Sequence, residues 1–163
     1  MKTLLLLRHA KSSWDDPSLS DFDRPLASRG KRDAPRMGKA LRKSGLIPDV
    51  IISSPAARAR ATSAAAVKAA RIESEPQFEE AVYGASSAEL MNVVRRLPDS
   101  ASSALLVGHN PGFEDLLERL TGEHQRMPTA ALAHVEIQVD HWEDVEDGKG
   151  KLVRLLTPKQ LDE

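Results

Sequence analysis

The stretch Leu4-Leu5-Leu6-Leu7-Arg8-His9-Ala10 decides the fold, because four consecutive leucines end abruptly in an arginine and a histidine. A short, continuous apolar run is typical of a strand buried on both faces, as in a parallel sheet. In open α/β sheets, ligands bind in the crevice beyond the carboxyl ends of the strands. We therefore expect Arg8 and His9 at the functional edge of the sheet, although many strands that bind nothing also end in polar residues.

A second stretch, residues 51–62, repeats this pattern: an apolar strand leads through Ser53-Ser54-Pro55 into an alanine-rich helix. Proline suits the first turn of a helix, and the free backbone N–H groups there favour anions. Arg58 falls within that first turn, where a cation opposes the helix dipole. This conflict indicates an anionic ligand, whereas solvation is the ordinary role of an arginine on such a helix and is what we expect of Arg60.

A third stretch, residues 104–112, is again an apolar strand, followed by Gly108 and His109. A lone histidine after a strand is more often an ordinary hydrogen-bonded side chain, and that interpretation is kept for His124, His134 and His141. Two histidines and two arginines at three strand ends are a different case. They describe a pocket of high positive potential that suits a dianionic phosphoryl group, whose oxygens match the arginine fork.

Strand and helix signals alternate along the chain. Helices are predicted at about 28–44, 56–70, 88–97 and 111–122, with serines as start signals for the first and third. Strands are predicted at about 50–53, 72–75, 104–107, 131–139 and 151–156, the last two as a hairpin. This alternation indicates a three-layer α/β/α sandwich: a mostly parallel central sheet with an antiparallel edge strand and helices on both faces.

The motifs Arg8-His9-Ala10, Ser53-Ser54-Pro55 with the following Arg58, and Gly108-His109-Asn110-Pro111 resemble those of the histidine phosphatase superfamily, the phosphoglycerate mutase-like proteins. The run from Arg8 to Trp14 and the compact length are most similar to its SixA-type phosphohistidine phosphatases. The resemblance covers about residues 2–112, with the motifs in the expected order. It implies a phosphoglycerate mutase-like fold and a phosphatase that needs neither metal nor other cofactor.

The resemblance also implies roles for the residues at the strand ends. His9 would be the nucleophile that takes the phosphoryl group, Arg8 and Arg58 would hold its oxygens, and His109 would donate a further hydrogen bond. Nearby positive groups lower the pKa of a histidine, which would keep His9 unprotonated and nucleophilic. Phosphoryl transfer asks mainly for positioning and charge stabilisation, which such a pocket supplies without a metal.

Two further residues have open roles. Arg24 matches an arginine that lines the same pocket in many relatives, and a loop arginine paired with a nearby aspartate is an equal alternative. Glu80 has the spacing to Tyr83-Gly84 of the acid-bearing motif in the mutase branch, and a surface charge is as good an interpretation. The phosphoramidate bond is labile, whereas an ester with an alkoxide leaving group needs a general acid. The role of Glu80 therefore bears on substrate choice.

These observations favour a protein phosphohistidine phosphatase, since the short segment between Tyr83 and Leu105 leaves the pocket open to a side chain of another protein. The alternative enzyme is a small-molecule phosphomonoesterase that uses Glu80 as general acid. An alternative of another class is a noncatalytic phosphoprotein-binding module, against which the intact Arg8, His9 and His109 argue. The expected partner is therefore a phosphorylated protein or a small phosphate ester.

Length and composition bound these hypotheses. The 163 residues predict a single domain, residues 1–163, large enough to bury a core. A net charge of −1 gives no overall attraction to nucleic acid or to an anionic membrane. The chain has no cysteine, which suits a reducing compartment, and the apolar run before Arg8 is too short for a signal peptide or membrane span. The cytoplasm is the expected location.

Overall fold

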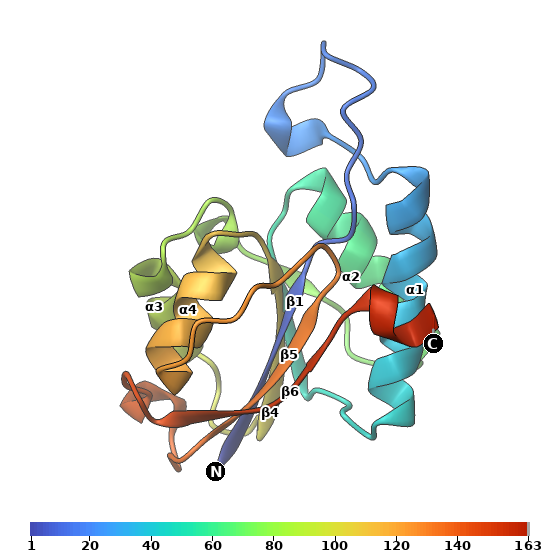
Figure 1. The fold of residues 1–163 in the computed structure, drawn as a ribbon. Helices are drawn as coiled ribbons and strands as arrows, with labels where there is room; N and C mark the ends of the chain where they lie inside the picture. The colour runs from blue at the N-terminus through green and yellow to red at the C-terminus, as the bar shows by residue number, and fades with distance from the viewer. Residues whose placement is uncertain (163) are drawn as a thin grey trace.

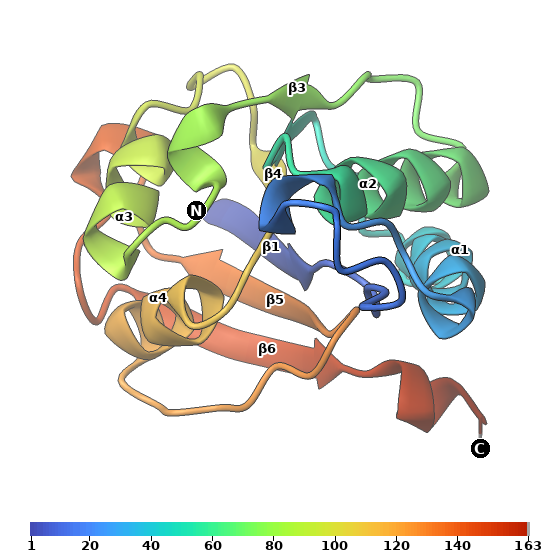
Figure 2. The same ribbon diagram turned by 90° about the horizontal axis from the view of Figure 1, so that it is seen from above.

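The computed structural model describes residues 1–162 as one six-stranded sheet flanked by helices on both faces (Figures 1 and 2). The strand order is β3-β2-β4-β1-β5-β6. The pairs β1–β4, β2–β4 and β2–β3 are parallel, while β1–β5 and β5–β6 are antiparallel. The strands are β1 (Lys2–Arg8), β2 (Val50–Ser53), β3 (Gln77–Phe78), β4 (Ser103–Gly108), β5 (Leu132–Ile137) and β6 (Gly150–Leu156).

The helices form the two outer layers of the predicted α/β/α sandwich. One face carries α1 (Ser28–Lys43) and α2 (Ala57–Ala70), and the other carries α3 (Ser87–Arg95) and α4 (Gly112–Thr121), as Figure 2 shows from above. Short 3₁₀ turns connect these elements: η1 (Asp21–Asp23), η2 (Glu80–Val82), η3 (Trp142–Asp144) and η4 (Pro158–Asp162). The predicted fold class is confirmed, with β5 as the strand that runs against its neighbours and β6 at the edge.

The leucine run of β1 supplies both halves of the core. Successive side chains of a strand point to opposite faces. Leu4 and Leu6 accordingly pack with residues of α3 and α4, whereas Leu5 and Leu7 pack with residues of α1 and α2, and all four are fully buried. At about 1.5–3 kcal/mol for each buried leucine, this one strand contributes substantially to the free energy of folding. β1 is therefore a fixed base for the residues at its carboxyl end.

One predicted strand is wrong. The apolar Ile72 suggested a strand at 72–75, but the strand that pairs with β2 is Gln77–Phe78. α2 ends at Ala70, the next residue Arg71 has a left-handed conformation, and Ile72 then packs into the core on the α1 and α2 face. Its hydrophobicity serves that packing and not the sheet.

The carboxyl ends of β1, β2 and β4 lie at one edge of the sheet, because these strands are parallel. The segment 12–25, between β1 and α1, projects beyond this edge in Figure 1 and carries η1. In Figure 2 it overlies the ends of β1 and β4. A bridge between Ser12 and Leu26 closes its base. Within residues 1–162, no helix is long and apolar enough to cross a membrane.

Candidate active site

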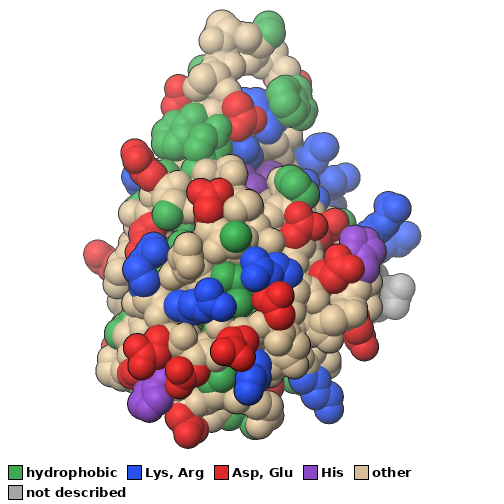
Figure 3. Space-filling view, turned by 90° about the vertical axis from the view of Figure 1, so that its left-hand side faces the viewer, with side chains coloured by type: hydrophobic (Ala, Val, Ile, Leu, Met, Phe, Trp, Pro, Cys, Tyr) green, Lys and Arg blue, Asp and Glu red, His purple; other side chains and the backbone are tan. Residues whose placement is uncertain are grey.

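The structure brings together the four residues that sequence analysis placed at the strand ends. Arg8 ends β1, His9 follows it, Arg58 lies in the first turn of α2, and His109 follows β4. His9 and Arg58 are each 6% exposed and His109 is 9% exposed. The two imidazole rings lie 5.1 Å apart, centroid to centroid. In Figure 3, histidine and basic side chains are seen below the projecting part of the molecule.

The His9 ring is held with one nitrogen free. Its Nδ1 lies 2.8 Å from the carbonyl oxygen of Ala10, and because a carbonyl can only accept, Nδ1 carries the proton and donates it. The lone pair is then on Nε2. Burial lowers the pKa of His9 to about 3, with smaller contributions from His109, Arg58 and Arg8. Desolvation, and not the positive neighbours that the sequence suggested, is thus the main reason that Nε2 stays unprotonated at neutral pH.

His109 is held in the same tautomer as His9, with its ring proton on Nδ1. The Ser54 hydroxyl oxygen accepts the backbone N–H of Ala56 (3.2 Å) and lies 2.7 Å from Nε2 of His109. The Ser54 hydroxyl can donate its own proton to Nε2 of His109. Nε2 is then an acceptor, so the ring proton is on Nδ1. Burial, followed by Arg58, lowers the pKa of His109 to about 4, so the ring is neutral. Ser54 belongs to the second sequence motif, but the sequence alone indicates no role for it.

Three buried N–H donors in the site have no partner within the described residues: Nε of Arg8, Nε of Arg58 and Nδ1 of His109. An unpaired buried polar group costs about 1–3 kcal/mol, more if it is charged, so such groups require an explanation. Arg8, Arg58 and His109 all lie close enough to His9 to lower its pKa, and their unpaired N–H groups together suit the oxygens of one phosphoryl group. A fourth unpaired atom, Oδ1 of Asn110, is an acceptor and has no part in binding an anion.

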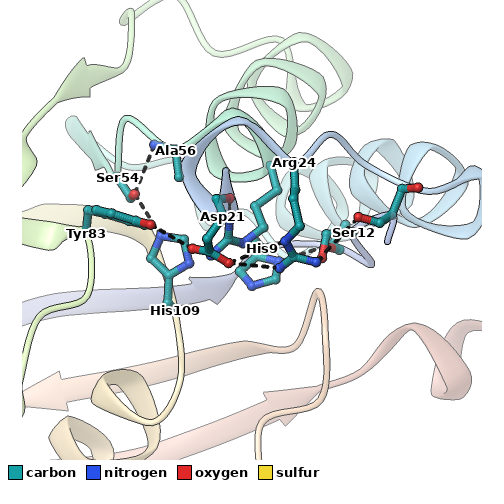
Figure 4. A network of polar contacts seen from close by, with 11 residues as sticks. His9, Ser12, Asp21, Arg24, Ser54, Ala56, Tyr83 and His109 are labelled. Atoms are coloured by element: carbon teal, nitrogen blue, oxygen red, sulfur yellow. Dashed lines mark hydrogen bonds and ion pairs between the residues drawn. The ribbon is translucent and has the colours of Figure 1, made fainter. Parts of the chain in front are cut away.

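Arg58 also binds the projecting segment, through a residue that sequence analysis missed. Its Nη1 donates to the Asp21 carbonyl (2.7 Å) and its Nη2 to Asp21 Oδ2 (3.0 Å). The Tyr83 hydroxyl donates to the same carboxylate oxygen at 2.7 Å. The Tyr83 hydrogen bond, followed by Arg58 and Arg24, holds the pKa of Asp21 at about 2 against the opposing effect of burial. Asp21 is therefore a carboxylate above the anion site (Figure 4).

Arg24 lies in the projecting segment and directs its charge at Asp21. Its guanidinium lies 3.3 Å from Asp21 Oδ1 and 3.0 Å from the Ser12 hydroxyl, and it stacks 3.4 Å from the centroid of the Trp14 ring. It is 7% exposed. This geometry matches the alternative in which a loop arginine pairs with a nearby aspartate.

Glu80 is exposed on η2. The side chain that reaches the site from this part of the chain is that of Tyr83, whose ring also packs edge-on against His109 with centroids 5.5 Å apart. The role of Glu80 stays a prediction, and Tyr83 is a further residue of this segment that contacts the site. Within residues 1–162, no three His, Asp or Glu side chains are placed to hold a metal ion together.

The chain is similar to several known proteins. Residues 4–136 match the model of the histidine phosphatase superfamily, branch 1. An uncharacterised chloroplast protein of Arabidopsis thaliana is 34% identical over 171 residues, 96% of this chain and 78% of its own. An uncharacterised protein of Mycobacterium tuberculosis is 33% identical over 164 residues, 94% of this chain and all of its own. A solved structure from Agrobacterium tumefaciens, provisionally named as phosphohistidine phosphatase SixA, has a TM-score of 0.83 at 30% identity, covering 96% of this chain and 98% of that one.

Proposed function

The chain belongs to the histidine phosphatase superfamily, and from this premise we propose that it removes phosphoryl groups from a protein phosphohistidine through a covalent intermediate on His9. The observation that carries this proposal is the trio of buried, unpaired donors on residues that surround His9, whose Nε2 has a free lone pair. A free lone pair among such donors is what nucleophilic phosphoryl transfer requires.

In the first step, the lone pair on His9 Nε2 attacks phosphorus. The bond from Nε2 to phosphorus forms as the bond from phosphorus to the substrate ring nitrogen breaks, and the substrate imidazole leaves with that electron pair. The His9 ring becomes positively charged, and its Nδ1–H bond to the Ala10 carbonyl stabilises that charge. Water then attacks the phosphohistidine, inorganic phosphate leaves, and the ring returns to its neutral state.

The three unpaired donors supply the charge stabilisation. Nε of Arg8, Nε of Arg58 and Nδ1–H of His109 would each bind an oxygen of the phosphoryl group as it passes between the two nitrogens. Phosphoryl transfer depends mainly on such positioning and on stabilisation of spread negative charge. Because the donors are fixed by burial, they need little reorganisation during the reaction. The proposed mechanism uses no metal and no other cofactor.

Two observations support a protein substrate: the mouth of the site is open, and neither nearby carboxyl group is a ready general acid. Between Tyr83 and β4 the chain forms only α3, so no inserted subdomain covers the mouth. Glu80 is exposed on η2, and Asp21 is ionised, so neither is a ready general acid for an alkoxide leaving group. The Agrobacterium tumefaciens structure carries the name of a phosphohistidine phosphatase. We place the reaction in the cytoplasm, since the chain has no cysteine to form disulfides.

The test is phosphate release from a phosphohistidine-bearing protein in the presence of a chelator. We expect release by the native chain, loss with His9→Ala, and retention with His124→Ala, which removes an exposed histidine. Turnover of phosphate esters alone, reduced by Glu80→Gln, would instead support the small-molecule phosphomonoesterase. Binding of the phosphoprotein without turnover of any substrate would support the noncatalytic module.

A further inference from the structure

We infer that Asp21 is a specificity-determining residue, which selects a phosphorylated nitrogen ring as substrate and disfavours phosphate esters. The inference rests on the proposed function and names the part of the site that receives the leaving group. It depends on three observations: where Asp21 lies, how its carboxylate is held, and which of its oxygens remains available.

Asp21 lies on the side of the site from which a leaving group departs. In-line displacement places the leaving atom opposite the nucleophile. His9 is at the floor, at the end of β1, so the leaving group faces the mouth. η1, which carries Asp21, overlies the ends of β1 and β4 there (Figure 2). In Figure 4 the Asp21 carboxylate lies between Tyr83 and Arg24, and its charge acts on the His109 ring.

The carboxylate is fixed by one oxygen and has acceptor capacity left on the other. Oδ2 accepts the hydrogen bonds of Tyr83 (2.7 Å) and Arg58 (3.0 Å). Oδ1 has only the longer contacts of Arg24, at 3.3 Å. A carboxylate has about four acceptor positions, and the side chain of Asp21 is 51% exposed, so Oδ1 can accept a further N–H from a ligand.

A phosphorylated imidazole supplies that N–H. Its distal ring nitrogen, when protonated, gives a cationic ring with the phosphoryl group on the other nitrogen. A carboxylate that accepts this N–H favours the cationic form. When the bond from phosphorus to nitrogen breaks, the electron pair goes to the ring, which leaves as neutral imidazole with its distal proton retained. Asp21 would thus assist departure without donating a proton.

The same carboxylate disfavours esters. An alkoxide leaving group gathers negative charge as its bond to phosphorus breaks, and a fixed carboxylate beside it raises the energy of that transition state. A metabolite that carries its own carboxylate would be repelled before reaction. Asp21 therefore contributes to selectivity in both directions, which a residue that merely holds the projecting segment would not do.

The experiment compares two substrates with each variant: one peptide carrying phosphohistidine and the same peptide carrying phosphoserine. Asp21→Asn is nearly isosteric and keeps an oxygen for Arg58 and Tyr83. Asp23→Asn is the matched control, since Asp23 lies in the same turn and bonds to Ser20. The measured quantity is the ratio of kcat/KM for phosphohistidine to that for phosphoserine. This ratio does not depend on how much of a preparation is folded.

We expect Asp21→Asn to lower this ratio by roughly 10- to 100-fold, the value of one charged hydrogen bond. Asp23→Asn should leave the ratio unchanged. An equal loss on both substrates with Asp21→Asn would overturn the inference, and would assign Asp21 to holding Arg58. Failure of the native chain itself to hydrolyse the phosphohistidine peptide would contradict the proposed function instead.

Discussion

Acidifying the free enzyme from pH 7 to pH 5 should leave both active-site histidines unprotonated. An ordinary histidine, with a pKa of about 6.5, retains roughly 3% of its neutral form at pH 5. With a pKa of about 3, His9 would remain roughly 99% neutral, so the nucleophile concentration differs about 30-fold between the two cases. His109, with a pKa of about 4, would also remain neutral.

The assay is NMR titration of the ring nitrogens in ¹⁵N-labelled protein, because the second ionisation of a phosphate substrate, near pH 6, would obscure a rate profile. Stability gives a second readout. The folded pKa of each ring lies below the unfolded value, so the stabilisation is complete above about pH 6.5 and is lost as the pH falls below it. Between the unfolded and the folded pKa, each ring lowers the free energy of unfolding by about 1.4 kcal/mol for each pH unit of acidification. Titration of either ring between pH 6 and 7 in the folded protein would show that burial does not keep the two histidines neutral.

Three substitutions test individual contacts. Arg58→Ala removes an oxygen-binding donor and should lower kcat by roughly 10²–10³. Arg60→Ala, on the exposed face of the same helix, should change kcat little. Equal losses of kcat in the two variants would contradict the role that we assign to Arg58. Ser54→Ala should lower kcat about tenfold, as one hydrogen bond and one tautomer are lost, and unchanged kinetics would show that Ser54 positions nothing. Gly108→Ala would place Cβ 2.7 Å from the buried Phe113 ring. It should therefore lower the free energy of unfolding, measured by urea titration, by about 1–3 kcal/mol. An unchanged urea midpoint would show that the ring can move aside.

The sheet and the four strand-end residues could be predicted because both follow from local pattern and topology. A run such as Leu4–Leu7 has no polar face, so it fits only a strand covered on both sides. Parallel strands then bring their carboxyl ends to one edge, which unites His9 and His109 although 100 residues separate them. Neither step needs knowledge of the side-chain packing.

The projecting segment could not be predicted in the same way. The sequence around Asp21 has no helix or strand periodicity. The position of Asp21 is set by hydrogen bonds from Arg58 and Tyr83, which lie far from it in the sequence. Tyr83, which follows η2, contacts Asp21 and His109, whereas Glu80 on η2 is exposed. Contacts between residues so far apart in the sequence produce no residue spacing from which they could be predicted.

The central claim is a covalent phosphoryl group on His9, and trapping it is the most direct measurement. The native chain would be mixed with a phosphohistidine protein, quenched rapidly at alkaline pH, where phosphohistidine survives, and digested for mass spectrometry. We expect one added phosphoryl group on His9, and none in His9→Ala. A phosphoryl group on another residue, or full phosphate release by His9→Ala, would contradict it.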